Sequence, residues 1–202
     1  MPSPRFSRLP PEKRARILAV ARMHLARDGI AGASYNRIIA DAEISKTTAY
    51  LYFDGKEDLV AEVRRELTAR LAEVMGPWEP ASSPRRFWSK LTASAQALHQ
   101  HLLGHPDDLA LLGQVPPDAE ANDPLTEAWF TALLEDGIRL GVIRDDVDRP
   151  LMLAATRALF RVSDEYVLER LHRGDEVDLG KAWTLLRGLW AAPPRAPRKG
   201  RA

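Results

Sequence analysis

Two short helical patterns follow one another almost without a gap in residues 34–53, and this stretch constrains the fold most. Ser34 is a good N-cap, and Ile38 and Ile39 lie on an apolar stripe at helical spacing behind it. Ser45 is a second N-cap and opens a pattern that is rich in hydroxyl groups. A helix, a tight turn and a polar second helix are the outline of a helix-turn-helix that reads DNA.

The second helix has one face suited to nucleic acid. If it packs across the first helix through Ala49 and Phe53, its polar side chains point outward. Lysine and threonine bind base edges or phosphates, and a leucine can contact a thymine methyl group. A plain helical hairpin with a polar surface is the alternative. The candidate DNA-binding residues are Ser34, Tyr35, Ser45, Lys46, Thr47, Thr48, Tyr50, Leu51, Tyr52 and Lys56.

Longer helices are expected on both sides of this stretch. Pro11 suits the first position of a helix, and Gly29 suits its C-terminal end. A helix over residues 56–75 is long enough to connect this region to the rest of the chain. Residues 1–10 hold three prolines and two arginines. We interpret them as a flexible terminus in preference to an arm that enters a minor groove.

The remainder of the chain also shows helical patterns, so the predicted fold is all-α with about nine helices. A linker rich in proline and serine begins at Pro77. The helices expected after it span 84–103, 107–114, 123–141, 149–172 and 178–192.

The last two of these helices are apolar over more than one face, which requires more than one partner surface. A second subunit can supply that surface, so we favour a homodimer over two core helices of a monomer. The predicted interface residues are Ala155, Ala158, Val162, Tyr166, Leu179, Trp183, Leu186 and Trp190.

Composition narrows the class of protein. Residues 1–71 carry 13 Lys and Arg against 9 Asp and Glu, whereas residues 72–192 carry 12 against 19. A basic N-terminal region followed by an acidic region is typical of a chain that binds a polyanion through one end only. Ordinary surface charge is the alternative. There is no cysteine, no apolar run long enough for a membrane helix and no secretion signal, so we expect a cytoplasmic protein. Enzyme signatures such as a phosphate-cradling glycine loop are absent, and no enzymatic activity is expected.

Large apolar residues between positions 84 and 172 are candidates for a ligand pocket, and plain core packing is the favoured alternative for each. These candidates are Trp88, Leu91, Leu98, Trp129, Phe130, Leu133 and Phe160. His101 and His105 have the spacing that places two imidazoles on one helix face. Without a clear carboxylate or cysteine partner, we predict no metal site and no cofactor.

Residues 11–71 resemble the DNA-binding domain of the TetR family of bacterial transcriptional regulators (TetR/AcrR type). The matching residues include Ser34, the run Ala42-Glu43-Ile44-Ser45, Tyr50, Tyr52-Phe53, Lys56-Glu57 and Leu59. Three positions depart from the family pattern. Glu43 replaces the turn glycine, Ile39 replaces a small alanine, and Thr47 stands where a small residue is frequent.

The resemblance implies a fold and a function. The implied fold is an N-terminal three-helix DNA-binding domain (residues 11–71, helix-turn-helix 34–53) followed by a helical ligand-binding and dimerisation domain (residues 77–192). The implied function is that of a homodimeric repressor that binds a palindromic operator in double-stranded DNA and is released by a small hydrophobic effector. The termini at 1–10 and 193–202 are expected to be flexible. The alternative is an all-α dimeric carrier of small molecules without specific DNA recognition.

Overall fold

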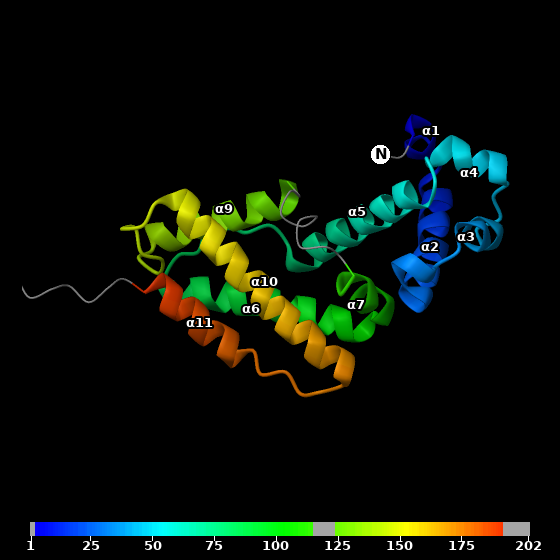
Figure 1. Cartoon of the computed structure of the whole chain (residues 1–202). Coiled ribbons are helices and arrows are strands. Elements are labelled where there is room, and N and C mark those ends of the chain that lie inside the picture. Colours follow the sequence, from blue (N-terminus) through cyan, green and yellow to red (C-terminus); the bar gives the residue numbers. More distant parts are fainter. Residues whose placement is uncertain (1–2, 115–123, 192–202) are drawn as a thin grey trace, which may run out of the picture. The chain divides into compact units, whose positions relative to one another are not determined.

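The computed structural model describes residues 3–114 and 124–191. Within these residues it contains ten helices and no strand, which confirms the all-α fold (Figure 1). Contacts divide the chain into two compact units, residues 1–77 with 93–125 and residues 78–92 with 126–202. None of the described helices is both long enough and apolar enough to cross a membrane. The predicted terminus 193–202 lies outside the described residues.

The first unit opens with five helices. They are α1 (Pro4–Ser7), α2 (Pro11–Gly32), α3 (Tyr35–Asp41), α4 (Lys46–Tyr52) and α5 (Lys56–Met75). Proline occupies the first turn of α1 and α2, where its missing N–H costs nothing. The core of these helices combines aliphatic side chains with a few aromatic rings, and Ile17, Leu25, Ile38 and Leu59 are each about 1% exposed. The two central helices of the predicted helix-turn-helix are thus α3 and α4, within a residue or two of the expected bounds.

The N-terminal segment differs from the flexible arm that the sequence suggested. Residues 4–7 form α1, and the Phe6 side chain is only 1% exposed. The prolines of this segment predict a loose tail, but burial of the Phe6 ring and hydrogen bonds from Ser3 to Tyr52 and Leu51 hold the segment in place.

The first long helix ends at Gly29 as expected, because the backbone there is not helical, and α2 includes a short further helical turn beyond this kink, up to Gly32. Gly29 has φ 73° and ψ 160°, a conformation that glycine adopts without strain. The kink removes the intrahelical acceptor of the Ile30 N–H, and the side-chain oxygen of Gln114 accepts that hydrogen bond at 2.8 Å. The glycine therefore ends the regular helix here, and the short helical turn follows it.

A buried carboxylate ties four helices of the first unit together. Asp108, on α7 (Pro106–Leu112), is 1% exposed. It accepts hydrogen bonds from Arg70 of α5 at 2.7 and 3.0 Å and lies 2.9 Å from His101 Nε2 of α6 (Pro84–Gly104). Arg22 of α2 lies 3.8 Å away. Burial alone raises the pKa of Asp108, but the hydrogen bonds from His101 and Arg70 and the charges of Arg70 and Arg22 outweigh it and hold the pKa below its ordinary value.

The second unit is built on α9 (Pro124–Arg139), α10 (Arg149–Arg173), α11 (Gly180–Trp190) and the first turns of α6. Its core is strongly aromatic. Phe87 and Trp190 are fully buried with ring centroids 6.0 Å apart, and Trp78 lies 5.0 Å from Phe87. The Trp190 indole N–H donates a 3.0 Å hydrogen bond to the buried Thr156 hydroxyl, which joins α11 to α10.

Candidate DNA-binding interface

The turn between α3 and α4 joins the two helices through four residues, 42–45. The Ile44 N–H donates to the Ile39 carbonyl at 3.1 Å, and the Glu43 N–H donates to the Ala40 carbonyl at 3.0 Å. Glu43 has φ 55°, which makes it the one non-glycine residue with positive φ in the described part of the chain. This position is where the family pattern has glycine, so the turn forms with its usual geometry despite the glutamate.

The second helix begins at a side-chain cap. The Ser45 hydroxyl accepts a 3.1 Å hydrogen bond from the Thr48 N–H, which confirms the predicted N-cap. The Thr48 hydroxyl lies 2.8 Å from the same Ser45 oxygen. Ser34 occupies the corresponding position before α3, but its side chain makes no capping hydrogen bond. Ser45 and Thr48 thus stabilise the start of α4.

The helix α4 has one buried and one exposed face. Ala49 and Phe53 are 0% and 1% exposed, as the predicted packing requires. On the opposite side, Tyr50 is 55% and Leu51 is 44% exposed. Lys46 and Thr47 are exposed on the same short helix. A cation, a hydroxyl, a phenol and an apolar side chain therefore lie together at the surface.

Two tyrosines form a pair at the edge of this surface. The ring of Tyr35, at the start of α3, lies 6.0 Å from the ring of Tyr50. The Tyr35 hydroxyl is buried and has no hydrogen-bond partner. Burial raises the pKa of Tyr35, and the proximity of Tyr50 and Asp58 raises it further. Tyr35 is placed to support the Tyr50 ring, while Tyr50 itself is open to a ligand.

Two other predicted contact residues are placed differently. Tyr52 is only 8% exposed, and its ring packs 5.9 Å from Phe6. Although Tyr52 is one of the candidate DNA-binding residues, its side chain belongs mainly to the core. Lys56 is half-buried, and its ammonium donates a 3.0 Å hydrogen bond to the Ala31 carbonyl.

A buried histidine that was not among the predicted site residues links α2 to α3. His24 is 2% exposed, and its Nε2 lies 2.7 Å from a carboxylate oxygen of Asp41. Its Nδ1 lies 3.1 Å from a guanidinium nitrogen of Arg27. A histidine on the apolar stripe of a long helix was the available signal. The pair fixes the C-terminal end of α3 against α2.

Comparison with known proteins agrees with this geometry. A family model described as "Bacterial regulatory proteins, tetR family" matches residues 17–63. The HTH-type transcriptional repressor SCO4008 of Streptomyces coelicolor is 30% identical over 156 residues, which cover 73% of this chain and 76% of that protein. The chain belongs to the TetR family. It is therefore a DNA-binding transcriptional regulator.

Solved structures of TetR regulators share the fold over most of the chain. A TetR-like transcriptional regulator from Rhodococcus sp. RHA1 is 25% identical with a TM-score of 0.59, covering 90% of this chain and 96% of that one. A TetR-family transcriptional regulator (ECA1819) from Pectobacterium atrosepticum has a TM-score of 0.60 at 22% identity and covers 91% and 96%. The second likeness concerns the fold alone.

The residues of this TetR regulator that were predicted to line an effector pocket fall into three groups. Leu91, Trp129 and Leu133 belong to the buried core of the second unit. Trp88, Phe130 and Phe160 are partly buried and pack against that core. Leu98 lies in the first unit. The rings of Trp129, Phe130 and Phe160 form a cluster with centroids 5.1 to 6.3 Å apart. The indole N–H of Trp129 is buried and has no hydrogen-bond partner.

The predicted dimer residues also divide. Leu186 and Trp190 are 1% and 0% exposed inside one protomer, so their assignment to the subunit interface is wrong. Both pack into the core of the second unit. Val162 is 52% exposed and Ala158 is exposed on α10. Ala155, Tyr166, Leu179 and Trp183 are partly buried.

Two exposed leucines of the same helices were absent from the predicted set. Leu151 of α10 is 62% exposed and Leu185 of α11 is 57% exposed. Because α11 is apolar on two faces, its sequence does not show which face packs on α10. The structure resolves this by burying the Leu186 side.

The histidines considered for a metal site have other partners. His101 Nε2 contacts Asp108, and His105 Nδ1 donates to the His101 carbonyl at 2.8 Å. The two rings are stacked with centroids 4.0 Å apart. In the described ranges, no group of three or more His, Cys, Asp or Glu side chains has an arrangement that could hold a metal ion.

Proposed function

We propose that this TetR regulator is a homodimeric repressor whose α4 reads an operator in the major groove. The observation that carries the proposal is the two-sided character of α4. Ala49 and Phe53 anchor the helix, while Lys46, Thr47 and Tyr50 are open to solvent. An anchored helix with exposed donors and a cation provides both base readout and phosphate binding. Repression is proposed because the related Streptomyces protein is described as a repressor.

Ile39 and Glu43 are the two departures from the family pattern that favour a carrier without DNA recognition. The observed helix-turn-helix forms with both residues in place. Ile39 is buried, with 5% of its surface exposed, and its carbonyl still accepts the hydrogen bond from Ile44. Glu43 adopts the positive φ that the turn needs. The helix-turn-helix geometry therefore supports the regulator. A regulator of transcription acts where the chromosome is, so we propose a cytoplasmic location.

We propose that α10 and α11 form the subunit interface through their exposed apolar side chains. Leu151 and Val162 on α10 and Leu185 on α11 are each more than half exposed. Ala154, Ala158 and Gly188 are exposed small residues on the same two helices. Large exposed leucines beside small residues allow two helix pairs to approach closely. Such a dimer presents two copies of α4 to the two halves of a palindrome.

We propose that a small apolar effector binds at the aromatic cluster of the second unit. The rings of Trp129, Phe130 and Phe160 offer apolar contact surface. The unpartnered indole N–H of Trp129 would donate a hydrogen bond to a single acceptor on that molecule. A buried donor without a partner costs about 1–3 kcal/mol, and a bound acceptor would recover part of this cost.

A salt-dependent binding experiment tests the DNA-binding role of α4. Fluorescence anisotropy would measure the affinity of the full chain for the DNA upstream of its own gene and for a scrambled duplex. We expect preference for the upstream DNA, and we expect the logarithm of the binding constant to fall linearly with the logarithm of salt concentration. Lys46→Gln should reduce the magnitude of the salt slope by about one, since one phosphate contact is lost. Equal affinity for both duplexes would contradict the proposal that α4 reads an operator sequence.

A further inference from the structure

The N-terminal segment, residues 3–9, lies against the C-terminal end of α4, and Figure 1 shows α1 beside it. The Ser3 N–H donates a 2.9 Å hydrogen bond to the Tyr52 carbonyl, and the Ser3 hydroxyl donates to the Leu51 carbonyl. The last four carbonyls of a helix have no partner within it. Ser3 therefore binds two backbone groups that α4 leaves free.

These bonds matter because α4 is short. It has seven residues, and a helix of this length is not stable by itself in water. Its orientation is set by the side chains and backbone groups that hold it from outside. Ser45 caps its start, and the N-terminal segment binds its end.

Phe6 is the apolar part of this attachment. Its side chain is 1% exposed, and its ring lies 4.6 Å from Phe53 and 5.9 Å from Tyr52. Phe53 and Tyr52 are the residues by which the end of α4 enters the core. Phe6 thus packs directly behind the helix whose opposite face is exposed.

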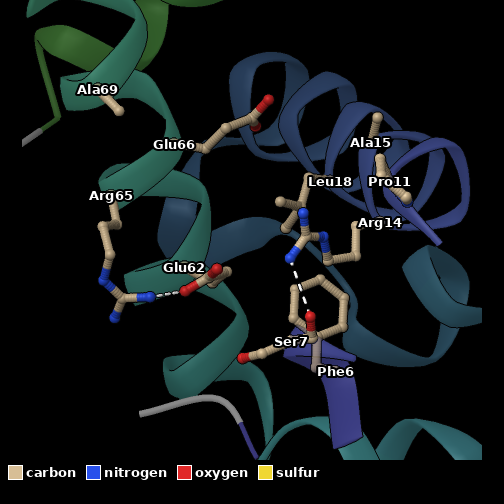
Figure 2. Close-up of a pocket in the computed structure, with 10 residues that line it drawn as sticks. All are labelled: Phe6, Ser7, Pro11, Arg14, Ala15, Leu18, Glu62, Arg65, Glu66 and Ala69. Atoms are coloured by element: carbon tan, nitrogen blue, oxygen red, sulfur yellow. Dashed lines mark hydrogen bonds and ion pairs between the residues drawn. The ribbon is translucent and has the colours of Figure 1, made fainter. Parts of the chain in front are cut away.

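The segment is itself fixed to α2. Figure 2 shows the Arg14 guanidinium reaching over the Phe6 ring to the Ser7 carbonyl, to which it donates a 3.0 Å hydrogen bond. Arg14, Phe6 and Ser7 all line an open groove of about 370 Å³ between α1, α2 and α5 (Figure 2). The Pro10 carbonyl also accepts bonds from the Lys13 and Arg14 N–H groups. A continuous set of contacts therefore runs from α2 through α1 to α4.

We propose that Ser3 and Phe6 are positioning residues that set the orientation of α4, so that the N-terminal segment determines operator specificity without contacting a base. This inference rests on the proposed role of α4 as the reading helix. Hydrogen bonds to base edges tolerate errors of only a few tenths of an ångström. Non-specific binding depends on phosphate neutralisation and tolerates a tilted helix. A loss of positioning therefore lowers specific binding more than non-specific binding.

The principal test is Phe6→Ala in the full chain. Anisotropy titrations would give the ratio of affinities for the upstream DNA and for a scrambled duplex. We expect this ratio to fall about tenfold or more while the salt slope for the scrambled duplex stays unchanged, because no cation is removed. Phe6→Leu should restore most of the ratio, since it refills the site. Phe87→Leu, a buried aromatic substitution in the second unit, is the matched control and should leave the ratio unchanged.

A second variant keeps the test decisive if Phe6→Ala does not fold. Ser3→Pro removes both donors to α4, and Ser3 already has φ −66° and ψ 154°, values that proline adopts before another proline. We expect a lower affinity ratio with little change in melting temperature. An unchanged ratio in Ser3→Pro or in folded Phe6→Ala, with the wild type still preferring the upstream DNA, overturns the positioning role. A wild type without preference instead overturns the proposed function of α4.

Discussion

Arg16 of α2 donates a 2.7 Å hydrogen bond to the carboxylate of Glu43, which lies in the turn that joins α3 to α4. The two side chains are 51% and 72% exposed, so the ion pair contributes well under about 1 kcal/mol. The positive φ of Glu43 costs a residue with a Cβ atom about 1–2 kcal/mol. Backbone strain at this position therefore outweighs the ion pair.

We accordingly predict that Glu43→Gly is more stable than Glu43→Ala by about 1 kcal/mol. Both substitutions remove the ion pair with Arg16, so their difference isolates the backbone conformation. Urea unfolding followed by circular dichroism measures the two free energies of unfolding. Equal stability of the two variants would show that the turn relaxes when the carboxylate is absent.

We predict that substitution of Tyr50 changes operator affinity, whereas substitution of Tyr35 changes the stability of the fold. Tyr50→Ala should weaken operator binding by about tenfold or more, since one good contact contributes about 1–3 kcal/mol. The fold should persist because Tyr50 is 55% exposed. Circular dichroism and anisotropy on the same sample check both statements, and unchanged affinity would exclude Tyr50 from the interface.

Tyr35→Phe should leave operator affinity unchanged and raise the free energy of unfolding by about 1 kcal/mol. The reason is that the substitution removes a buried hydroxyl without a partner and keeps the ring that contacts Tyr50. Thermal unfolding and anisotropy measure the two quantities. A loss of affinity would show instead that the Tyr35 hydroxyl reaches the DNA.

Gly137 on α9 should tolerate no side chain. A Cβ atom there would lie 2.5 Å from Ile143 Cδ1 and 3.3 Å from the Phe87 ring. Gly137→Ala should lower the free energy of unfolding by about 1–3 kcal/mol through overpacking. Gly104→Ala is the control, because a Cβ at Gly104 meets nothing within 4 Å. Denaturant unfolding compares the two, and equal stabilities would mean that the core repacks freely.

The buried carboxylate of Asp108 should make stability depend on acid pH. Its folded pKa lies below the ordinary value of 3.8, so the folded chain binds this proton less readily than the unfolded chain. The stabilisation is present above about pH 4 and is lost as pH falls through the folded pKa. Arg22, Arg70 and His101 are the charged or titratable groups that face it.

We therefore expect the stability difference between the wild type and Asp108→Asn to shrink from about pH 5 to about pH 3. Wild type should be the more stable protein at the upper end, where Asp108→Asn leaves Arg70 with a weaker partner. Urea unfolding across this range measures the difference. If this stability difference does not change with pH, protonation of Asp108 does not contribute to the loss of stability in acid.

Val162→Asp should convert the proposed dimer to a monomer and weaken operator binding, because a carboxylate would be buried in an apolar interface. Val162 is 52% exposed in one protomer, so its fold should survive the change. Analytical ultracentrifugation measures the molecular mass. Leu103→Asp is the matched control, as Leu103 is 54% exposed on α6. A Val162→Asp dimer would place the interface elsewhere.

Helical periodicity and end signals gave most element bounds correctly. Pro11, Ser45 and Gly76 mark helix ends in the structure as in the sequence, because capping is a local property of the chain. Gly29 also marks a helix end, but the short turn after it is held by Gln114, which accepts the Ile30 N–H from 84 positions further along the chain. Local sequence cannot show a partner at that distance.

The same limit applies to side-chain roles. Exposure of Tyr50 and burial of Ala49 followed from helical spacing. Burial of Tyr52 did not, because it depends on Phe6 in a segment that proline made look unstructured. Assignment of Trp190 to the subunit interface was wrong for a related reason. Its indole is held inside the protomer by the Thr156 hydroxyl, and the sequence pattern of α11 alone does not show this contact with another helix.

The placement of Trp190 bears on how the protein assembles in a cell. Its indole bonds to Thr156, and its carbonyl accepts a 2.9 Å hydrogen bond from the Arg144 N–H. The aromatic core is thus closed within one chain, and a newly made chain needs no partner to complete it. Formation of the proposed dimer would then be a separate equilibrium that follows protomer concentration. If this dimer binds the operator as proposed, gene dosage and degradation rate would control how much of the operator is occupied.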